Sequence, residues 1–243
     1  MRSLPHATFL HVFLRTYLVG AAFNMRGLQN VGFMYAMDPG LAAIHKDSNE
    51  LRKARNRYAR HYNCHLFWAP LVAGMLLHTE SEIARGRMSP ATFSAIKDTA
   101  VNTLSALGDS VFGGTLLVTW GLVMAACVIS GHPWLALAAT AALFMALQIF
   151  KFCTFIAGVR YGLSAIFWLR RWDLINWGDR LKTGNALILL LVLFLCLPDV
   201  NDSAPLWALA VVCLILAAWL TARLHIPRAL LALAATTTVL FLL

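Results

Sequence analysis

Polar side chains that could bind a ligand occur in three short stretches that are otherwise apolar. The stretches are FNMRGLQNVGFMYAMDP (23–39), YNCHLFWAP (62–70) and NTLSALGDSVFGGT (102–115). Amide, imidazole, carboxylate and hydroxyl groups donate or accept hydrogen bonds, and in an apolar context they are costly unless they are paired. We therefore single out six residues as candidates for binding a polar ligand: Asn24, Gln29, Asn63, His65, Asp109 and Ser110.

Simpler interpretations exist for the same groups. Asp109 or Ser110 could cap a helix that begins at residue 111, by accepting hydrogen bonds from its free amides. The amides near residue 24 could hydrogen-bond neighbouring helices. His61 and His65 are four residues apart, which is a metal-ligand spacing, but no third ligand is fixed by spacing. We expect no metal site.

The motifs of common catalytic and nucleotide sites do not occur in the sequence. It contains no G-x-S-x-G elbow, no P-loop and no G-x-G-x-x-G. Nothing sets up a nucleophile with a base and a group that orients it. We therefore expect no catalytic residues, no cofactor and no enzymatic activity of the chain's own.

The segments that position these polar groups are more apolar than those of a water-soluble protein. Of the 243 residues, 60% are hydrophobic and 13% are charged, and the mean hydropathy is +0.69. Soluble domains have about 45–50% apolar and about 25% charged residues. The composition predicts an all-α, polytopic helical membrane protein, because spanning segments must satisfy their own backbone hydrogen bonds. The net charge of +9 then reflects basic cytoplasmic loops rather than nucleic-acid binding.

In the first half of the chain (1–110), polar residues interrupt the apolar ones every few positions. Residues 1–20 predict an amphipathic interfacial helix. The apolar runs 27–37 and 64–77 are too short to span a bilayer and favour re-entrant or buried pieces. Between them, 45–62 reads as a charged, solvated helix. Ser89-Pro90 predicts a capped helix start.

The second half (111–243) holds the main expected spans. They cover 111–131, 132–150 and 206–224; the run 185–197 is short, and 229–243 is apolar. The loops 159–184 and 223–228 are basic and 198–205 is acidic, so the positive-inside rule places the basic loops in the cytoplasm. We expect one domain over 1–243, with a break between two helices at Gly108-Asp109-Ser110.

The three stretches occur in the order and spacing of a known family. FNMRGLQNVGFMYAMDP is similar to a family stretch F-N-Y-E-R-M-Q-x-x-G-F-x-Y-x-M-x-P, and YNCHLFWAP to F-N-T-H-P-x-x-A-P. FSAIKDTAVNTLSALGDSVFGGTL (93–116) is similar to a segment that ends in G-D-S-x-x-x-G-T. The chain thus resembles enzyme IID, the membrane subunit of the mannose/fructose/sorbose class of bacterial phosphotransferase sugar permeases.

The resemblance implies an assembly and a transport function. IID subunits pair with a IIC subunit as a trimer of heterodimers in the bacterial inner membrane, and they move a hexose-type sugar by an elevator-type shift. Soluble IIA and IIB proteins carry the phosphoryl group, and IIB phosphorylates the sugar. The candidate residues would line the sugar site, with Phe33, Tyr35 and Trp68 stacking on the pyranose ring. Membrane lipid is a further expected partner.

The sequence departs from the family at several positions. Met25-Arg26-Gly27-Leu28 replaces Tyr-Glu-Arg-Met, and Leu66 replaces the proline after the histidine. Two other hypotheses therefore stay open. The chain could be a degenerate homologue with a structural or regulatory role beside IIC, or an unrelated intramembrane metalloenzyme that uses His61 and His65.

Overall fold

The described part of the chain is mostly helical. The computed structural model describes residues 5–196 and five helical residues between 208 and 216. The chain divides into two compact units, Met1–Val192 and Leu193–Leu243, and the first carries all six candidate residues. Among the described residues there is no extended strand, only isolated bridges between Asn24 and Leu28 and between Leu28 and Tyr62. The all-α prediction is confirmed.

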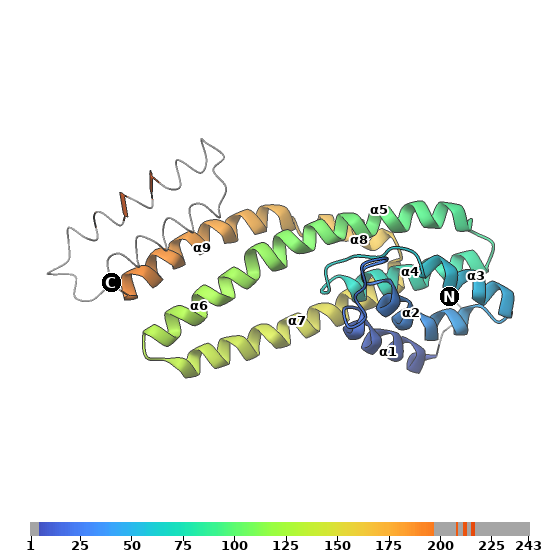
Figure 1. The fold of residues 1–243 in the computed structure, drawn as a ribbon, viewed down its shortest axis with the longest axis horizontal. Coiled ribbons are helices and arrows are strands. Elements are labelled where there is room, and N and C mark those ends of the chain that lie inside the picture. The colour runs from blue at the N-terminus through green and yellow to red at the C-terminus, as the bar shows by residue number, and fades with distance from the viewer. Residues whose placement is uncertain (1–4, 197–207, 209–210, 213–214, 217–243) are drawn as a thin grey trace. The chain divides into compact units, whose positions relative to one another are not determined.

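Short helices form the N-terminal part of the first unit. They are α1 (His6–Arg15), the 3₁₀ turn η1 (Thr16–Leu18), α2 (Asn30–Ile44), α3 (Ser48–Tyr58) and α4 (Ala69–Ala84). Figure 1 shows them gathered around one end of the long helices. Helices α2 and α4 contain most of the two runs that were expected to be re-entrant or buried, and α4 is buried along most of its length.

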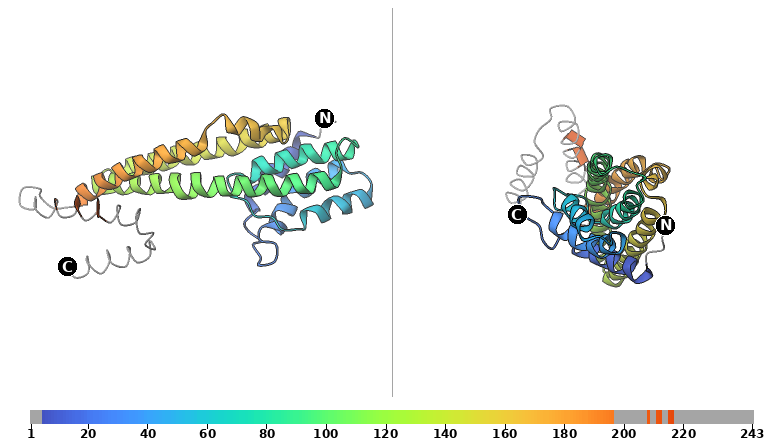
Figure 2. Two further views of the ribbon diagram at one scale, coloured as in Figure 1. Left: turned by 90° about the horizontal axis from the view of Figure 1, so that it is seen from above. Right: turned by 90° about the vertical axis from the view of Figure 1, so that its right-hand side faces the viewer.

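The other named helical elements of the described residues include the three longest. They are α5 (Pro90–Gly108), η2 (Asp109–Leu116), α6 (Leu117–Ile129), α7 (Pro133–Tyr161), α8 (Ser164–Arg170) and α9 (Leu174–Cys196). The first three form one uninterrupted rod, Pro90–Ile129, and this rod and α7 are both long and apolar enough to cross a membrane (Figures 1 and 2). The expected spans 111–131 and 132–150 are the apolar parts of these longer helices.

The C-terminal expectations are tested only in part. The described part of the short apolar run, 185–196, is the end of the longer helix α9. The expected span at 206–224 is described at five helical residues only, and the run at 229–243 lies outside the described residues.

The helix break expected at Gly108-Asp109-Ser110 is wrong. The chain stays helical there and widens into a π-helix over Asp109–Leu116. The hydroxyl of Thr115 donates to the carbonyl oxygen of Ser110, five residues earlier, at 2.9 Å. From α9, the amide of Asn185 donates to the carbonyl oxygen of Thr115 at 3.2 Å. The first bond lies within the π-helix, the second joins it to α9, and the rod continues into α6 without a break.

Two helix starts follow from local sequence. The hydroxyl of Ser89 accepts a hydrogen bond from the amide of Thr92 at 3.1 Å, and Pro90 occupies the first turn of α5, as predicted. The carboxylate of Asp47 accepts from the amides of Asn49 and Glu50, which starts the charged helix α3 within the expected range 45–62. Short-range side-chain chemistry thus fixes both boundaries.

Helices α4 and α7 cross at a pair of glycines. A Cβ atom on Gly158 would lie 2.5 Å from the carbonyl oxygen of Leu71, and one on Gly74 would overlap that of Phe155. Backbone cannot move aside as a flexible side chain can. Small residues allow this close approach, which gives the two helices many dispersion contacts.

Three ionisable side chains join α2, α3 and α4. The guanidinium of Arg57 on α3 donates two hydrogen bonds to Glu80 on α4, at 3.1 and 2.6 Å. Nε2 of His45, directly after α2, lies 2.9 Å from the same carboxylate, whose side chain is 0% exposed. Burial alone would raise the pKa of Glu80, but the hydrogen bonds from His45 and Arg57 outweigh it and hold the pKa below its usual range.

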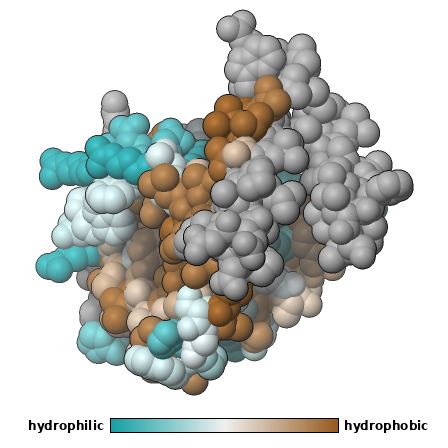
Figure 3. Space-filling view, turned by 90° about the vertical axis from the view of Figure 1, so that its left-hand side faces the viewer, coloured by the Kyte–Doolittle hydropathy of each residue, from teal (hydrophilic) through white to brown (hydrophobic). Residues whose placement is uncertain are grey.

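The ends of α6 and α7 that meet at Gly131 present an apolar surface. Between Asp109 and Lys151 the sequence has no Asp, Glu, Lys or Arg. On α7, Leu137 is 72% exposed and Phe144 59% exposed. Figure 3, which faces this end, shows hydrophobic side chains gathered across the middle of the view, with hydrophilic ones at the margin. Hydrocarbon is the environment that suits such a surface.

Replacing Gly158 with alanine should destabilise the α4–α7 crossing. The new methyl group would overlap the backbone of α4 and force the helices apart, at a cost of roughly 1–3 kcal/mol. Thermal unfolding in detergent should show a melting temperature lowered by roughly 3–10 °C. Gly121→Ala is the matched control, because no atom lies within 4 Å of the position that its Cβ would take. An equal effect of the two changes would contradict the close crossing.

Replacing Glu80 with glutamine should destabilise the protein by about 3–5 kcal/mol at pH 7. The largely buried guanidinium of Arg57 would then face a neutral amide in place of its carboxylate partner. The folded-state pKa of Glu80 is depressed, so its contribution is present above its unfolded pKa of about 4.3 and is lost as pH falls through the lower folded value. Unfolding curves from pH 7 to pH 3.5 should therefore converge for wild type and Glu80→Gln. Glu50→Gln, at an exposed ion pair, should change little.

Candidate functional site

Four of the six candidate residues line one cavity. Gln29, Asn63, His65 and Asp109 surround a volume of about 410 Å³. They come from the residue before α2, from the loop before α4 and from the first π-turn of the long rod. The rest of the lining is Cys64, Leu66, Phe67, Ser105 and Lys151. Segments 80 residues apart therefore converge on one cavity whose lining includes polar side chains.

Backbone hydrogen bonds hold the first two stretches side by side. The amide of Gln29 donates to the carbonyl oxygen of Tyr62 at 2.9 Å, and the amide of Tyr62 donates to that of Gly27 at 3.2 Å. The side-chain oxygen of Gln29 then accepts from the amide of Cys64 at 3.1 Å. Gln29 therefore holds the neighbouring loop in place, and its NH₂ group is left as the part that can face a ligand.

Gly108 allows the loop before α4, which carries His65, to pack directly on the long rod. A Cβ atom at Gly108 would overlap Cβ of His65 and would lie 2.8 Å from the indole of Trp68. The imidazole of His65 also stacks on Phe112, with ring centroids 5.2 Å apart and planes 22° apart. The glycine before Asp109 is thus required by packing, and it brings the histidine to the level of the aspartate.

His65 is neutral and has one tautomer favoured by its surroundings. Burial lowers the pKa of His65, Lys151 lowers it further, and Asp109 opposes both. The amide of Phe67 donates to Nδ1 at 3.3 Å, so the proton of the neutral ring resides on Nε2. His65 therefore offers a ligand a hydrogen-bond donor without a charge, while Asp109 offers acceptors.

Lys151 is a site residue that sequence reasoning missed. Its ammonium lies 4.8 Å from the ring centroid of Phe67 and 4.4 Å from that of Tyr17, and it lines the same cavity as Asp109. No ion pair joins it to any acid in the described part of the chain. The sequence did carry a signal, because Lys151 is the first charge after a long apolar run, and ionisable residues in such segments tend to be functional.

Asn24 and Ser110 lie apart from the lining of this cavity. The amide of Asn24 donates to the carbonyl oxygen of Leu28 at 3.2 Å and to the side chain of Asn30 at 2.9 Å. Asn24 lines a neighbouring cavity formed with Arg26 and Arg60. Ser110 is exposed on the rod next to Asp109, and its carbonyl oxygen accepts from Thr115. The expected cap formed by Asp109 or Ser110 is absent from η2.

Two of the three aromatic rings expected to stack on a sugar are part of the core. Phe33 is 0% exposed and stacks on Tyr62 with centroids 3.7 Å apart, and Trp68 is also 0% exposed. Neither has a free face, so this expectation is wrong for both. Tyr35 is 47% exposed, but the guanidinium of Arg15 lies 4.2 Å from its ring centroid. Sequence spacing cannot tell which face of α2 turns inward.

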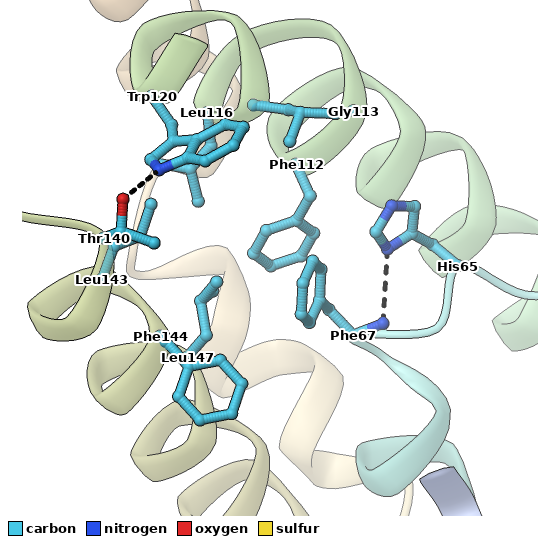
Figure 4. A pocket seen from close by; sticks show the side chains of 11 residues that line it. His65, Phe67, Phe112, Gly113, Leu116, Trp120, Thr140, Leu143, Phe144 and Leu147 are labelled. Atoms are coloured by element: carbon cyan, nitrogen blue, oxygen red, sulfur yellow. Dashed lines mark hydrogen bonds between the residues drawn. The ribbon is translucent and has the colours of Figure 1, made fainter. Parts of the chain in front are cut away.

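An apolar cavity of about 240 Å³ adjoins the polar one and shares His65 and Phe67 with it. Figure 4 shows the rings of Phe67 and Phe112 pointing toward each other between the rod and α7, with Phe144 and Leu147 opposite. The indole of Trp120 donates to the hydroxyl of Thr140 at 3.1 Å (Figure 4). One face of the imidazole is thereby kept from water, which is the burial that lowers its pKa.

The labelling rate of the Cys64 thiol can measure how closely the loop that carries His65 packs on the rod. Burial raises the pKa of its thiol to about 12, so at pH 8 only about one molecule in ten thousand carries the reactive thiolate. In a variant with Cys127, Cys153, Cys196 and Cys213 changed to serine, a water-soluble maleimide should label Cys64 very slowly. Gly108→Ala should speed labelling at least about tenfold, because the loop must move away from the rod. Gly121→Ala should leave the rate unchanged, and equal rates in both variants would contradict the role of Gly108.

Comparison with known proteins identifies the family of the chain. The sequence model of the family described as "PTS system mannose/fructose/sorbose family IID component" matches residues 3–177. The mannose-specific EIID component of the Escherichia coli phosphotransferase system is 27% identical over 165 residues, which cover 67% of this chain and 57% of that protein. The fructose permease IID component of Bacillus subtilis is 22% identical over 66% of this chain and 58% of that protein. The matches span little more than half of these relatives.

Two solved structures share the fold. A structure described as that of a membrane protein has a TM-score of 0.61 and 22% identity, over 77% of this chain and 70% of that one. The cryo-electron-microscopy structure of a mannose transporter in complex with a microcin has a TM-score of 0.54 and 19% identity, over 98% of this chain and 95% of that one. With the two apolar helices, these findings indicate a membrane protein. Because the family match covers most of the sequence, the chain belongs to the mannose/fructose/sorbose family of IID components of the phosphotransferase system.

Proposed function

We propose that the chain is a membrane subunit of a sugar permease and that the polar cavity is its sugar subsite. The observation that carries the proposal is the convergence of Gln29, Asn63, His65 and Asp109 on one cavity of about 410 Å³. That volume lies within the range of about 300–1,000 Å³ that is typical of small-molecule sites. The mannose- and fructose-specific names of its relatives make a hexose the first substrate to test.

The chemistry of the lining suits a polyhydroxylated ligand. Asp109 offers carboxylate oxygens that accept from hydroxyl groups, while the amide of Gln29 and Nε2 of the neutral His65 donate. Lys151 supplies charged donors opposite the carboxylate without neutralising it in a short ion pair. Among the described residues, no hydrogen bond joins the side chain of Cys64 or Ser105 in this lining to that of His65, Asp109 or Lys151, and the proposed role is binding and translocation rather than catalysis.

The proposed partners follow from the family. In this proposal the subunit assembles with a IIC subunit in the bacterial inner membrane, as a trimer of heterodimers that moves the sugar by an elevator-type shift. Soluble IIA and IIB proteins carry the phosphoryl group to the sugar as it emerges. The solved mannose transporter with the same fold supports pairing within a transporter complex.

A second candidate function is that of a degenerate subunit which stabilises or regulates a IIC-containing complex. The observation that favours it is Arg26, because the family's acid at this position could accept hydrogen bonds and a guanidinium cannot. The metal-based alternative with His61 and His65 has no support from a third ligand, since the described residues contain no group of three potential metal ligands.

Asp109→Asn should weaken sugar uptake when the chain is co-expressed with its IIC, IIB and IIA partners in cells that lack their own IID. Loss of a charge-assisted hydrogen bond costs about 1.5–3 kcal/mol, which corresponds to roughly 10–100-fold in the sugar concentration for half-maximal uptake. Radiolabelled mannose and fructose are the probes. Asp179→Asn is the matched control, because Asp179 is 66% exposed on α9, its partner Lys182 is also exposed, and it does not line the cavity.

The outcomes distinguish the two candidate functions. Normal uptake by an Asp109→Asn variant that still co-purifies with IIC would show that the carboxylate does not bind the sugar. Absence of uptake of any tested sugar by the unmutated chain, with retained co-purification, would favour the structural or regulatory subunit.

A further inference from the structure

Two arginine side chains and a histidine meet in a second cavity, beside the polar one. Arg26, Arg60 and His61, here called the basic loop cluster, line a volume of about 540 Å³ together with Asn24 and Asn30. They come from two loops: Arg26 lies between η1 and α2, and the other two follow α3. All three cluster side chains are exposed in the chain. The proposed sugar subsite uses none of them.

The basic loop cluster lacks a counter-charge. No acidic residue lines its cavity, and no ion pair of the described residues includes Arg26, Arg60 or His61. Arg60 also interacts electrostatically with Lys97, a further positive charge. In contrast, Arg55 and Arg57 on the preceding helix each bind a carboxylate. Two guanidinium groups are therefore left with all their donors available.

The walls of this cavity are held by hydrogen bonds made inside the chain. The side chain of Asn30 accepts from the amide of Asn24 and donates to the carbonyl oxygen of Ala59 at 2.7 Å. The backbone amides of Arg26 and Gly27 donate to the side-chain oxygen of Asn24 at 3.1 and 2.8 Å. Both loops are thus fixed relative to each other before any ligand arrives, which lowers the entropic cost of binding.

The distribution of charge along the two apolar helices places the cluster near the membrane boundary. Asp109 and Lys151 are the first charged residues on either side of the turn at Gly131. Each lies about 20 residues from that turn, or about 30 Å at 1.5 Å per residue, which is the thickness of a bilayer's hydrocarbon core. The loop 61–65 packs on Gly108 at this level and is bonded to the loop that holds Arg26.

Apolar side chains flank the cluster on its exposed side. Phe23 and Met25 lie on either side of Asn24, and Met25 directly precedes Arg26. Phe23 is 58% exposed and Met25 is 93% exposed. Exposed apolar side chains next to arginine suit the boundary between acyl chains and headgroups, where the apolar groups can enter the bilayer and the guanidinium can reach phosphate.

We propose that the basic loop cluster is a phosphate-binding site, and that its position makes an anionic phospholipid headgroup the source of the phosphate. Arg26 and Arg60 supply planar, bidentate donors that match phosphate oxygens, and His61 adds a further ring donor. The site depends on membrane insertion and not on the proposed sugar subsite, so the two can fail separately.

Native mass spectrometry of the full chain, purified in detergent, can test the proposal. The probe is phosphatidylglycerol, compared with phosphatidylcholine of the same acyl chains. The wild type should bind phosphatidylglycerol at least about tenfold more tightly than the double variant Arg26→Gln/Arg60→Gln does. The matched control is Arg52→Gln/Lys53→Gln, which removes two exposed cations from α3 and should retain binding.

A second arm adds inorganic phosphate and identifies the source. Displacement of phosphatidylglycerol only by very high phosphate concentrations supports the lipid headgroup, while tight binding of inorganic phosphate supports the site but overturns the lipid as its source. Equal binding of the two lipids by the wild type overturns the proposal without any variant. Equal loss in the cluster and control variants overturns it as well, because binding would then depend on net charge alone.

Discussion

The lack of charge between Asp109 and Lys151 is the constraint on which the rest of this structure depends. Hydrocarbon offers no hydrogen bonds, so two helices of this composition must satisfy their own backbone groups. Polar side chains are thereby displaced to the ends of the apolar stretch. The polar cavity and the basic loop cluster both lie at that level, where loops from the N-terminal part pack against the long rod.

Glycine is what allows those loops and helices to approach. Gly74 and Gly158 bring the backbones of α4 and α7 together, and Gly108 admits His65 to the surface of the rod. Directly after Gly108 comes Asp109, so one contact sets both the packing of the loop and the distance between imidazole and carboxylate. The buried carboxylate of Glu80 plays a different part, because it joins three short helices through charge rather than through close backbone contact.

Local sequence predicted some of this arrangement well. The start of α5 at Ser89-Pro90 depends on hydrogen bonds within four residues, and the charged helix α3 on its own cap and charges. Gln29, Asn63, His65 and Asp109 were found because polar groups in apolar stretches stand out. The grouping of these four in one cavity was expected from the family resemblance and not from spacing.

Other features depend on contacts that spacing does not reveal. Phe33 and Trp68 look like ligand-binding aromatics in the sequence, but tertiary packing buries both. Lys151 was overlooked because it follows a run that was read only for its length. The glycines after Asp109 suggested a break, while the widened turn is held by Asn185, 70 residues further along the chain. No local pattern contains that bond.

The π-helix also sets the orientation of the following helix, α6, about its own axis. A π-turn accommodates one residue more than an α-turn, so it acts as a one-residue insertion that rotates the following helix by about 100° around its axis. The pairing of Trp120 with Thr140 across α6 and α7 is made in this rotated frame. The short stretch Asp109–Leu116 therefore works as an angular offset, which lets a single rod turn one face to the N-terminal loops and a different face to its neighbour α7.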